Sequence, residues 1–136
     1  MQKKGGITIM DFICQIKTNK SFEDAVIAVQ AQTQANGFRV LHVHDVQATL
    51  AEKNFTHEPL KIIEVCNAKY AYSALQIEIT VSLLMPCRIN VYTKDGQTII
   101  STFRPTALVA MFQKPELADF AEDVDRILTK IIDESK

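Results

Sequence analysis

The C-terminal part of the chain carries the pattern that most constrains the fold. From Pro115 onward, apolar residues recur every three or four positions, and charged residues fill most positions between them. Because proline suits the first turn of a helix, this pattern predicts a long amphipathic helix that starts near Pro115. We expect its apolar face to cover a hydrophobic core; the alternative is that this face binds a partner or a second copy of the chain. The apolar stripe consists of Leu117, Phe120, Val124, Ile127, Leu128 and Ile131.

Five shorter segments are typical of β-strands, because they alternate apolar and polar residues or form short runs rich in Ile and Val. The Lys94-Asp95-Gly96 sequence predicts a hairpin turn between the last two strands. Pro86 lies inside the fourth segment and indicates a sheet edge or a bulge there. The predicted strands are residues 10–17, 38–44, 60–65, 83–92 and 97–103.

Three further helices are indicated by residues that cap helix ends. Ser21, with Asp24 three positions later, is typical of a helix start, and Asn36-Gly37 is typical of a helix end. Asp45 can cap a short helix, and Asn67 can cap another over residues 68–75. The predicted element order is therefore β-α-β-α-β-α-β-β-α.

This order and the composition predict one α+β domain. Hydrophobic residues make up 47% and charged residues 23% of the 136 residues, as in ordinary globular domains. We expect a single mixed β-sheet of about five strands with helices mainly on one face. Residues 10–136 are predicted to form the domain, and residues 1–9 a flexible lead-in.

The charge balance gives no indication of a nucleic-acid or membrane partner. The chain has 15 basic and 16 acidic residues, and it has no apolar stretch of the length needed to span a bilayer. Asp11 interrupts the apolar segment near the start, so a signal peptide is not predicted. An odd number of cysteines, Cys14, Cys66 and Cys87, favours reduced thiols. We expect a cytoplasmic protein that binds neither nucleic acid nor a membrane.

Common catalytic motifs are missing from the sequence. It contains no glycine-rich phosphate loop, no HExxH, no paired-cysteine zinc motif and no G-x-S-x-G turn. The sequence therefore favours a binding protein over an enzyme, and no cofactor is expected.

Cys66 is the residue with the clearest chemical alternative. It ends a predicted strand directly before Asn67, and a helix start can lower the pKa of a thiol. Burial among apolar residues would raise that pKa instead and leave Cys66 as packing. If the third and fourth strands are neighbours, Cys66 and Cys87 could approach each other and form a regulatory disulfide.

A metal site is a further alternative. His42 and His44 alternate along one strand and would place two imidazoles on the same face. Two ligands do not make a site, so a third would have to come from His57, Cys66 or an acidic residue.

Three motifs together resemble a known family. The first comprises Gly37-Phe38, Val40-Leu41 and the stretch from Asp45 to Lys53; the second is Cys66-Asn67-Ala68 followed by Ala71 and Ala74-Leu75; the third is Met85-Pro86-Cys87 followed by residues 89–92. They resemble, in the same order, the signatures of the bacterial and archaeal family catalogued as domain of unknown function number 302. Ala68 replaces the proline usual in the second motif, and Met85 replaces the leucine usual in the third.

The resemblance implies a compact α/β fold that forms homodimers, without an established activity. It also implies that Cys66, Asn67 and Cys87 occupy signature positions. Our leading hypothesis is a non-enzymatic homodimeric domain that binds a small ligand or partner in an apolar pocket. The candidate binding residues are Cys66, Asn67, Cys87 and Arg88. The alternative functions are thiol redox or sulfur-transfer chemistry by Cys66 with Cys87, and metal binding.

Overall fold

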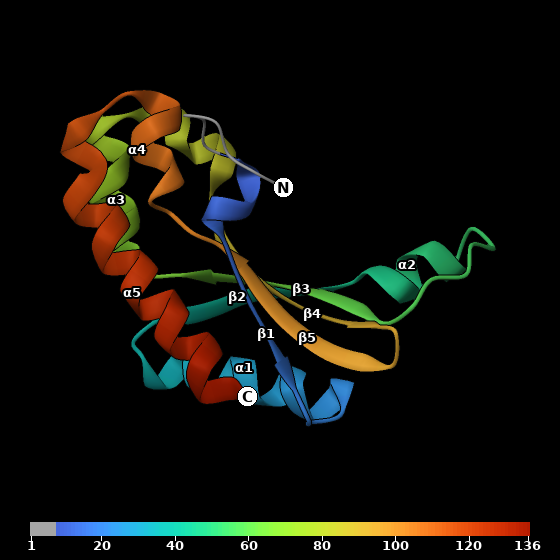
Figure 1. The fold of residues 1–136 in the computed structure, drawn as a ribbon. Coiled ribbons are helices and arrows are strands. Elements are labelled where there is room, and N and C mark those ends of the chain that lie inside the picture. The colour runs from blue at the N-terminus through green and yellow to red at the C-terminus, as the bar shows by residue number, and fades with distance from the viewer. Residues whose placement is uncertain (1–7) are drawn as a thin grey trace.

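A single five-stranded sheet organises the protein (Figure 1). The computed structural model describes residues 8–136. The sheet order is β1-β5-β4-β3-β2, and every neighbouring pair is antiparallel. The strands are β1 (Ile13–Thr18), β2 (Arg39–Asp45), β3 (Leu60–Cys66), β4 (Cys87–Lys94) and β5 (Gln97–Phe103).

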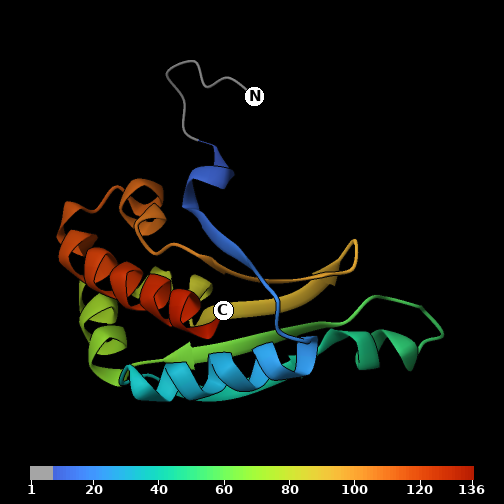
Figure 2. The same cartoon turned by 60° about the horizontal axis from the view of Figure 1, so that its bottom comes forward.

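Helices α1 and α5 pack against each other and against one face of this sheet, as Figure 2 shows with the lower side turned forward. The α-helices are α1 (Phe22–Ala35), α2 (Val46–Ala51), α3 (Ala68–Ile77), α4 (Ala107–Phe112) and α5 (Ala118–Ser135). The 3-10 helices are η1 (Ile9–Phe12), η2 (Ile79–Leu84) and η3 (Pro115–Leu117). Of the shorter helices, α2 connects β2 to β3, α3 and η2 connect β3 to β4, η1 precedes β1, and α4 and η3 lie between β5 and α5.

The main core lies between the sheet and these two helices. Alternate residues of the central strands point into it, and the apolar stripe of the C-terminal segment covers them, as the sequence predicts. The fully buried side chains of this core include Val29, Ile63, Val65, Ile89, Val91, Ile100, Leu128, Ile131 and Ile132. The residues between them along the strands, such as Arg88 and Asn90, point to the opposite face of the sheet.

The predicted helix caps and the predicted hairpin turn are confirmed. The side chains of Ser21, Asp45 and Asn67 each accept a hydrogen bond from the first turn of the helix that follows. Asp95 and Gly96 both have positive φ, 52° and 75°, as a tight turn between β4 and β5 requires.

The α+β class and the single sheet are confirmed, but the sheet is antiparallel throughout rather than mixed. Strands β2 and β3 are neighbours, as are β3 and β4, so α2 and α3 act as long hairpin connections instead of parallel crossovers. Helix α1 joins β1 to β2 at opposite edges of the sheet.

The first and fourth strands start later than the sequence predicts. Residues 9–12 form η1, so the first strand starts at Ile13. Pro86 precedes β4 instead of interrupting it, which lets β4 occupy the centre of the sheet with all its ladder donors. Helix α4 was not predicted. Of the expected lead-in, residues 1–7 lie outside the described part of the chain.

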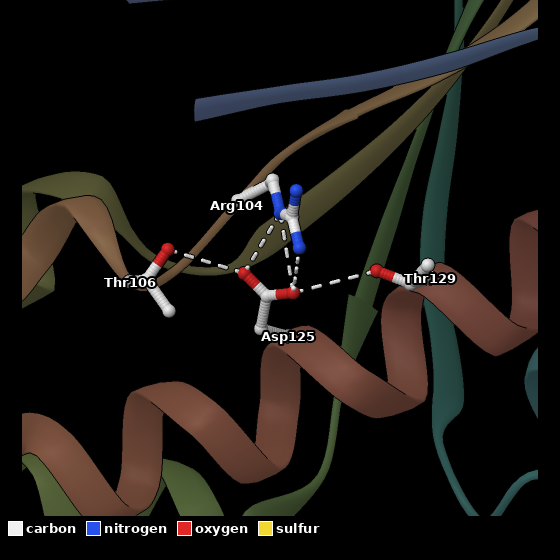
Figure 3. Close-up of polar contacts among 4 residues, drawn as sticks. All are labelled: Arg104, Thr106, Asp125 and Thr129. Atoms are coloured by element: carbon white, nitrogen blue, oxygen red, sulfur yellow. Dashed lines mark hydrogen bonds and ion pairs between the residues drawn. The ribbon is translucent and has the colours of Figure 1, made fainter. Parts of the chain in front are cut away.

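An ion pair that is buried on its Asp125 side joins the end of β5 to the middle of α5 (Figure 3). Asp125 is almost fully buried, and Arg104 donates to its carboxylate from Nε and Nη2 at 3.0–3.2 Å. The hydroxyl groups of Thr106 and Thr129 also donate to this carboxylate, at 3.2 and 3.4 Å. The hydrogen bonds to this carboxylate, together with its charge, raise the pKa of Arg104.

We expect Asp125→Ala to lower the free energy of unfolding by about 2–3 kcal/mol, because it leaves Arg104 and two hydroxyl groups without their acceptor. Asp123→Ala is the matched control on the same helix. Among residues 8–136 its carboxylate pairs only with Arg126 at the surface, so its loss should cost less than about 0.5 kcal/mol. Urea unfolding followed by circular dichroism measures both, and equal losses in the two variants would contradict the structural role of Asp125.

Candidate functional site

A pocket of about 510 Å³ opens at the end of the sheet where β4 begins and β5 ends. The lining residues Arg88, Asn90 and Ser101 point to the face of the sheet opposite α1 and α5. Other lining residues belong to η1 and α4, which are at the top of Figure 1. The lining of the pocket is mostly apolar and comes from separate parts of the chain. The lining residues are Ile9, Ile13, Leu84, Pro86, Cys87, Arg88, Asn90, Ser101, Thr102, Phe103, Pro105, Leu108 and Met111.

The walls of the pocket are fixed by packing outside it. Leu108 belongs to a second apolar cluster that joins α3, η2, α4 and the start of α5. On the other side, the rings of Phe12 and Phe103 lie with centroids 6.4 Å apart and hold η1 against the end of β5. The side chains of Leu108 and Phe103 in the wall thus also pack against residues outside the pocket lining.

The polar groups of the pocket lie on the sheet. Arg88 and Asn90 are two residues apart on β4, and Ser101 of β5 is the cross-strand partner of Asn90. Thr102 uses its hydroxyl to donate to the carbonyl oxygen of Arg88 at 2.7 Å. The side-chain oxygen of Asn90 is buried and accepts no hydrogen bond from the described residues.

Beside the pocket, Glu64 of β3 is the cross-strand partner of Arg88. Its carboxylate pairs with the Nε2 atom of His44 at 3.0 Å. This hydrogen bond is the largest cause that lowers the pKa of Glu64, and the charge of Arg88 adds to it. Glu64 is therefore held as an anion, and its direct partner is the histidine.

Of the four predicted binding residues, Cys87 and Arg88 line the pocket, and Cys66 and Asn67 do not. The side-chain oxygen of Asn67 accepts from the backbone N–H groups of Lys69 and Tyr70, and its amide nitrogen donates to the carbonyl oxygen of Gly37 at 3.0 Å. Its hydrogen-bonding groups are therefore used to cap α3 and to join it to the turn before β2.

Cys66 and Cys87 lie on neighbouring strands, as the disulfide hypothesis requires, and both are free thiols. Val65 is the cross-strand partner of Cys87, so the two cysteines are offset by one position. Burial raises the pKa of the Cys66 thiol, which is opposite to the shift that a helix start was expected to produce. Burial, with a smaller effect of Cys66, raises the pKa of Cys87 to about 11.

The imidazole rings of His42 and His44 do share one face, with centroids 4.3 Å apart. Within residues 8–136, no group of three or more His, Cys, Asp or Glu side chains is placed to hold a metal ion. His57 instead contacts the carbonyl oxygen of Glu58.

Most pocket residues were not indicated by the sequence. Asn90 and Ser101 occupy ordinary polar positions in strands, and Phe103, Leu108 and Met111 look like any apolar residues near a strand end. The one usable signal was Pro86, because a proline directly before an apolar strand marks where the backbone enters the sheet.

Comparison with known proteins identifies the family. The family described as "Domain of unknown function DUF302" matches residues 14–135. The chain belongs to this family. A crystal structure of an uncharacterized conserved DUF302 protein from Bacillus stearothermophilus is similar, with a TM-score of 0.87 and 28% sequence identity, over 92% of this chain and 98% of that one. A search of curated proteins found no match. No helix in the described part of this DUF302 chain is long and apolar enough to cross a membrane.

The thiol of Cys87 should react slowly with alkylating reagents at neutral pH, and its reaction rate should keep rising at pH values where an ordinary thiol has reached its maximum rate. In the double variant Cys14→Ser, Cys66→Ser, we expect the labelling rate with a maleimide to rise about tenfold per pH unit from pH 8 to 10, because the thiolate is the reactive form and the pKa is raised to about 11. The urea-denatured variant is the control, and its rate should level off near pH 9.5, about one unit above an ordinary thiol pKa. A plateau below pH 9 in the folded protein would contradict the burial of Cys87.

Asn67 should matter for stability and not for binding in the pocket. We expect Asn67→Ala to lower the free energy of unfolding by about 1–2 kcal/mol, because the cap of α3 is lost. Asn67→Asp is the comparison, since it keeps the capping oxygen and loses only the bond to Gly37. Chemical denaturation measures both variants. An unfolding free energy unchanged in Asn67→Ala would show that the cap is not needed.

Proposed function

We propose that this DUF302 protein is a non-enzymatic, homodimeric module that binds a small ligand in the pocket between β4, β5, η1 and α4. The observation that carries the proposal is the pocket itself. Its volume of about 510 Å³ lies within the range of small-molecule sites in proteins, about 300–1,000 Å³. Apolar walls with a few polar groups at one side are the usual composition of such sites.

The chemistry of the lining supports binding more than catalysis. Cys87 is among the residues that line the pocket, its side chain also packs against the main core, and its pKa of about 11 keeps the thiol protonated at neutral pH. A protonated, largely buried thiol behaves as a small apolar group and contributes to the wall of a site.

The dimer part of the proposal is supported by exposed apolar side chains beside the pocket. We define the rim as Ile9, Met10, Leu83, Leu84 and Met111, all of which are exposed. Leu83 is 80% exposed. Exposed apolar groups that gather in one place are typical of protein–protein contacts, and we propose a second copy of the chain as the partner that covers them.

Filling the pocket should block binding. Ser101→Phe places an aromatic ring beside Asn90, and we expect it to weaken binding of the apolar fluorophore N-phenyl-1-naphthylamine by about tenfold or more, because the probe loses buried area. Gln97→Phe is the matched control on the same face of β5, outside the pocket. Fluorescence titration measures both, and equal affinities in the two variants and the wild type would contradict the proposed site.

Placing a charge on the rim should separate the two copies. We expect wild-type protein to elute as a dimer in light-scattering chromatography at micromolar concentration and Leu83→Glu to elute as a monomer, because a carboxylate in an apolar contact is left desolvated. Ile27→Glu is the control, since Ile27 is exposed to a similar extent, 63%, on α1. A monomeric wild type, or a dimer that Leu83→Glu leaves intact, would contradict the proposal.

The alternative of thiol redox chemistry is supported by one observation, the neighbouring positions of Cys66 and Cys87 on β3 and β4. Its step would form one S–S bond between the two cysteines, with two electrons and two protons passing to an added disulfide such as oxidised glutathione. Native mass spectrometry of the Cys14→Ser variant before and after such treatment tests it, because in that variant a reversible loss of two hydrogens per chain can come only from Cys66 and Cys87.

A further inference from the structure

Two polar side chains of the pocket, Arg88 and Asn90, each lack a partner among the described residues: Arg88 lacks an anion, and the side-chain oxygen of Asn90 lacks a hydrogen-bond donor. Arg88 and Asn90 point to the same face of β4, and the apolar residues of η1 and α4 lie across the pocket from them. A ligand in this pocket would therefore meet polar groups at the sheet and apolar groups everywhere else. The guanidinium of Arg88 is exposed and open to a ligand, whereas the side-chain oxygen of Asn90 is buried. The partners that these two groups lack among the described residues indicate what the polar end of a ligand would supply.

Arg88 lacks a paired anion. Within residues 8–136, no carboxylate lies within 4.0 Å of its guanidinium group. Glu64 is its cross-strand partner, but the Glu64 carboxylate pairs with His44 at 3.0 Å. The guanidinium carries a permanent charge and five N–H donors in a planar arrangement that matches an anionic group.

Asn90 lacks a donor. Its side-chain oxygen is buried, and none of the described residues donates a hydrogen bond to it. An unpaired buried acceptor is unfavourable, and in native proteins most such groups have a partner. Ser101, directly opposite on β5, does not supply the missing bond. An O–H or N–H group of a ligand in the pocket would do so.

We infer that the pocket binds a small amphipathic monoanion: Arg88 holds its anionic group, Asn90 accepts a hydrogen bond from an adjacent O–H or N–H, and its apolar body lies against Phe103, Leu108 and Met111. This inference rests on the proposed function, since it assigns a chemical class to the ligand of the same pocket. The anion and the hydrogen-bond donor belong at the same end of the molecule, because Arg88 and Asn90 are two residues apart on one strand face.

The test compares two probes that share an apolar body and an N–H group. The first is 1-anilinonaphthalene-8-sulfonate, which carries an anion, and the second is N-phenyl-1-naphthylamine, which is neutral. We expect the wild type to bind the sulfonate more tightly by about tenfold or more, since a hydrogen-bonded charge pair contributes that much. In Arg88→Met the preference should fall below about threefold, with the neutral probe bound as before.

Arg39→Met is the matched control. Arg39 lies on β2 outside the pocket, so this variant makes the same change in net charge and should keep the preference. Equal loss in both variants would mean that the sulfonate responds to overall charge, and the inference would be wrong.

Asn90→Leu provides a second, independent readout. Because it removes an unpaired buried oxygen, we expect the ligand-free variant to be at least as stable as the wild type, while its affinity for both probes falls by about threefold or more. A variant that is less stable and binds equally well would show that Asn90 serves the fold.

The outcomes separate the two proposals. If neither probe binds in the wild type, or if Ser101→Phe leaves both affinities unchanged, the pocket is not a ligand site and the proposed function fails. If both probes bind with equal affinity, Ser101→Phe blocks both and Arg88→Met changes neither, the site stands and its assignment to anions is wrong.

Discussion

The ion pair between Arg104 and Asp125 connects the end of the β-sheet to helix α5. Arg104 directly follows the last strand, and Asp125 lies in the helix that covers the opposite face of the sheet from the pocket. A carboxylate this deeply buried is stable only because three side chains donate to it. The hydrogen bonds of Arg104 and Thr106 to Asp125 set the direction in which the chain leaves β5, and this direction determines the position of α4.

That direction matters for the pocket, because α4 supplies Leu108 and Met111 to its wall. Thr106, between Arg104 and α4, donates to the same carboxylate, so the connection is held at two points. The contacts of Asp125 thus hold both α5, which covers the main core, and the segment that leads to α4, which forms one wall of the pocket.

The elements with local signals could be predicted from the sequence. Ser21, Asp45 and Asn67 cap helices through bonds to residues two or three positions away, and Asp95-Gly96 forms its turn within four residues. The C-terminal helix could be predicted from the periodicity of its own apolar residues. These features depend on nearby residues alone, so a single sequence carries the information.

The sheet order, helix α4 and most of the pocket could not be predicted. Helix α4 has six residues, too few to show a helical repeat. The pairing of Arg104 with Asp125, and the pocket that Ile9 and Met111 both line, bring together distant parts of the chain, and no local pattern marks them. Cys87 was named because the family resemblance implies a signature position there, and Arg88 directly follows it. Asn90, two residues later, looked like an ordinary strand residue, although its lack of a partner is the more informative feature.

The sheet order also has a consequence for how the molecule is assembled. Strand β1 is made first during synthesis but pairs with β5 alone, with Ile13 opposite Phe103 and Thr18 opposite Thr98. Contacts between such distant residues form late, because a long loop must close before they are gained. The first strand can therefore pair within the sheet only after the β4–β5 hairpin has left the ribosome. Since η1 and β1 form one wall of the pocket, the pocket is among the last parts of the protein to take shape.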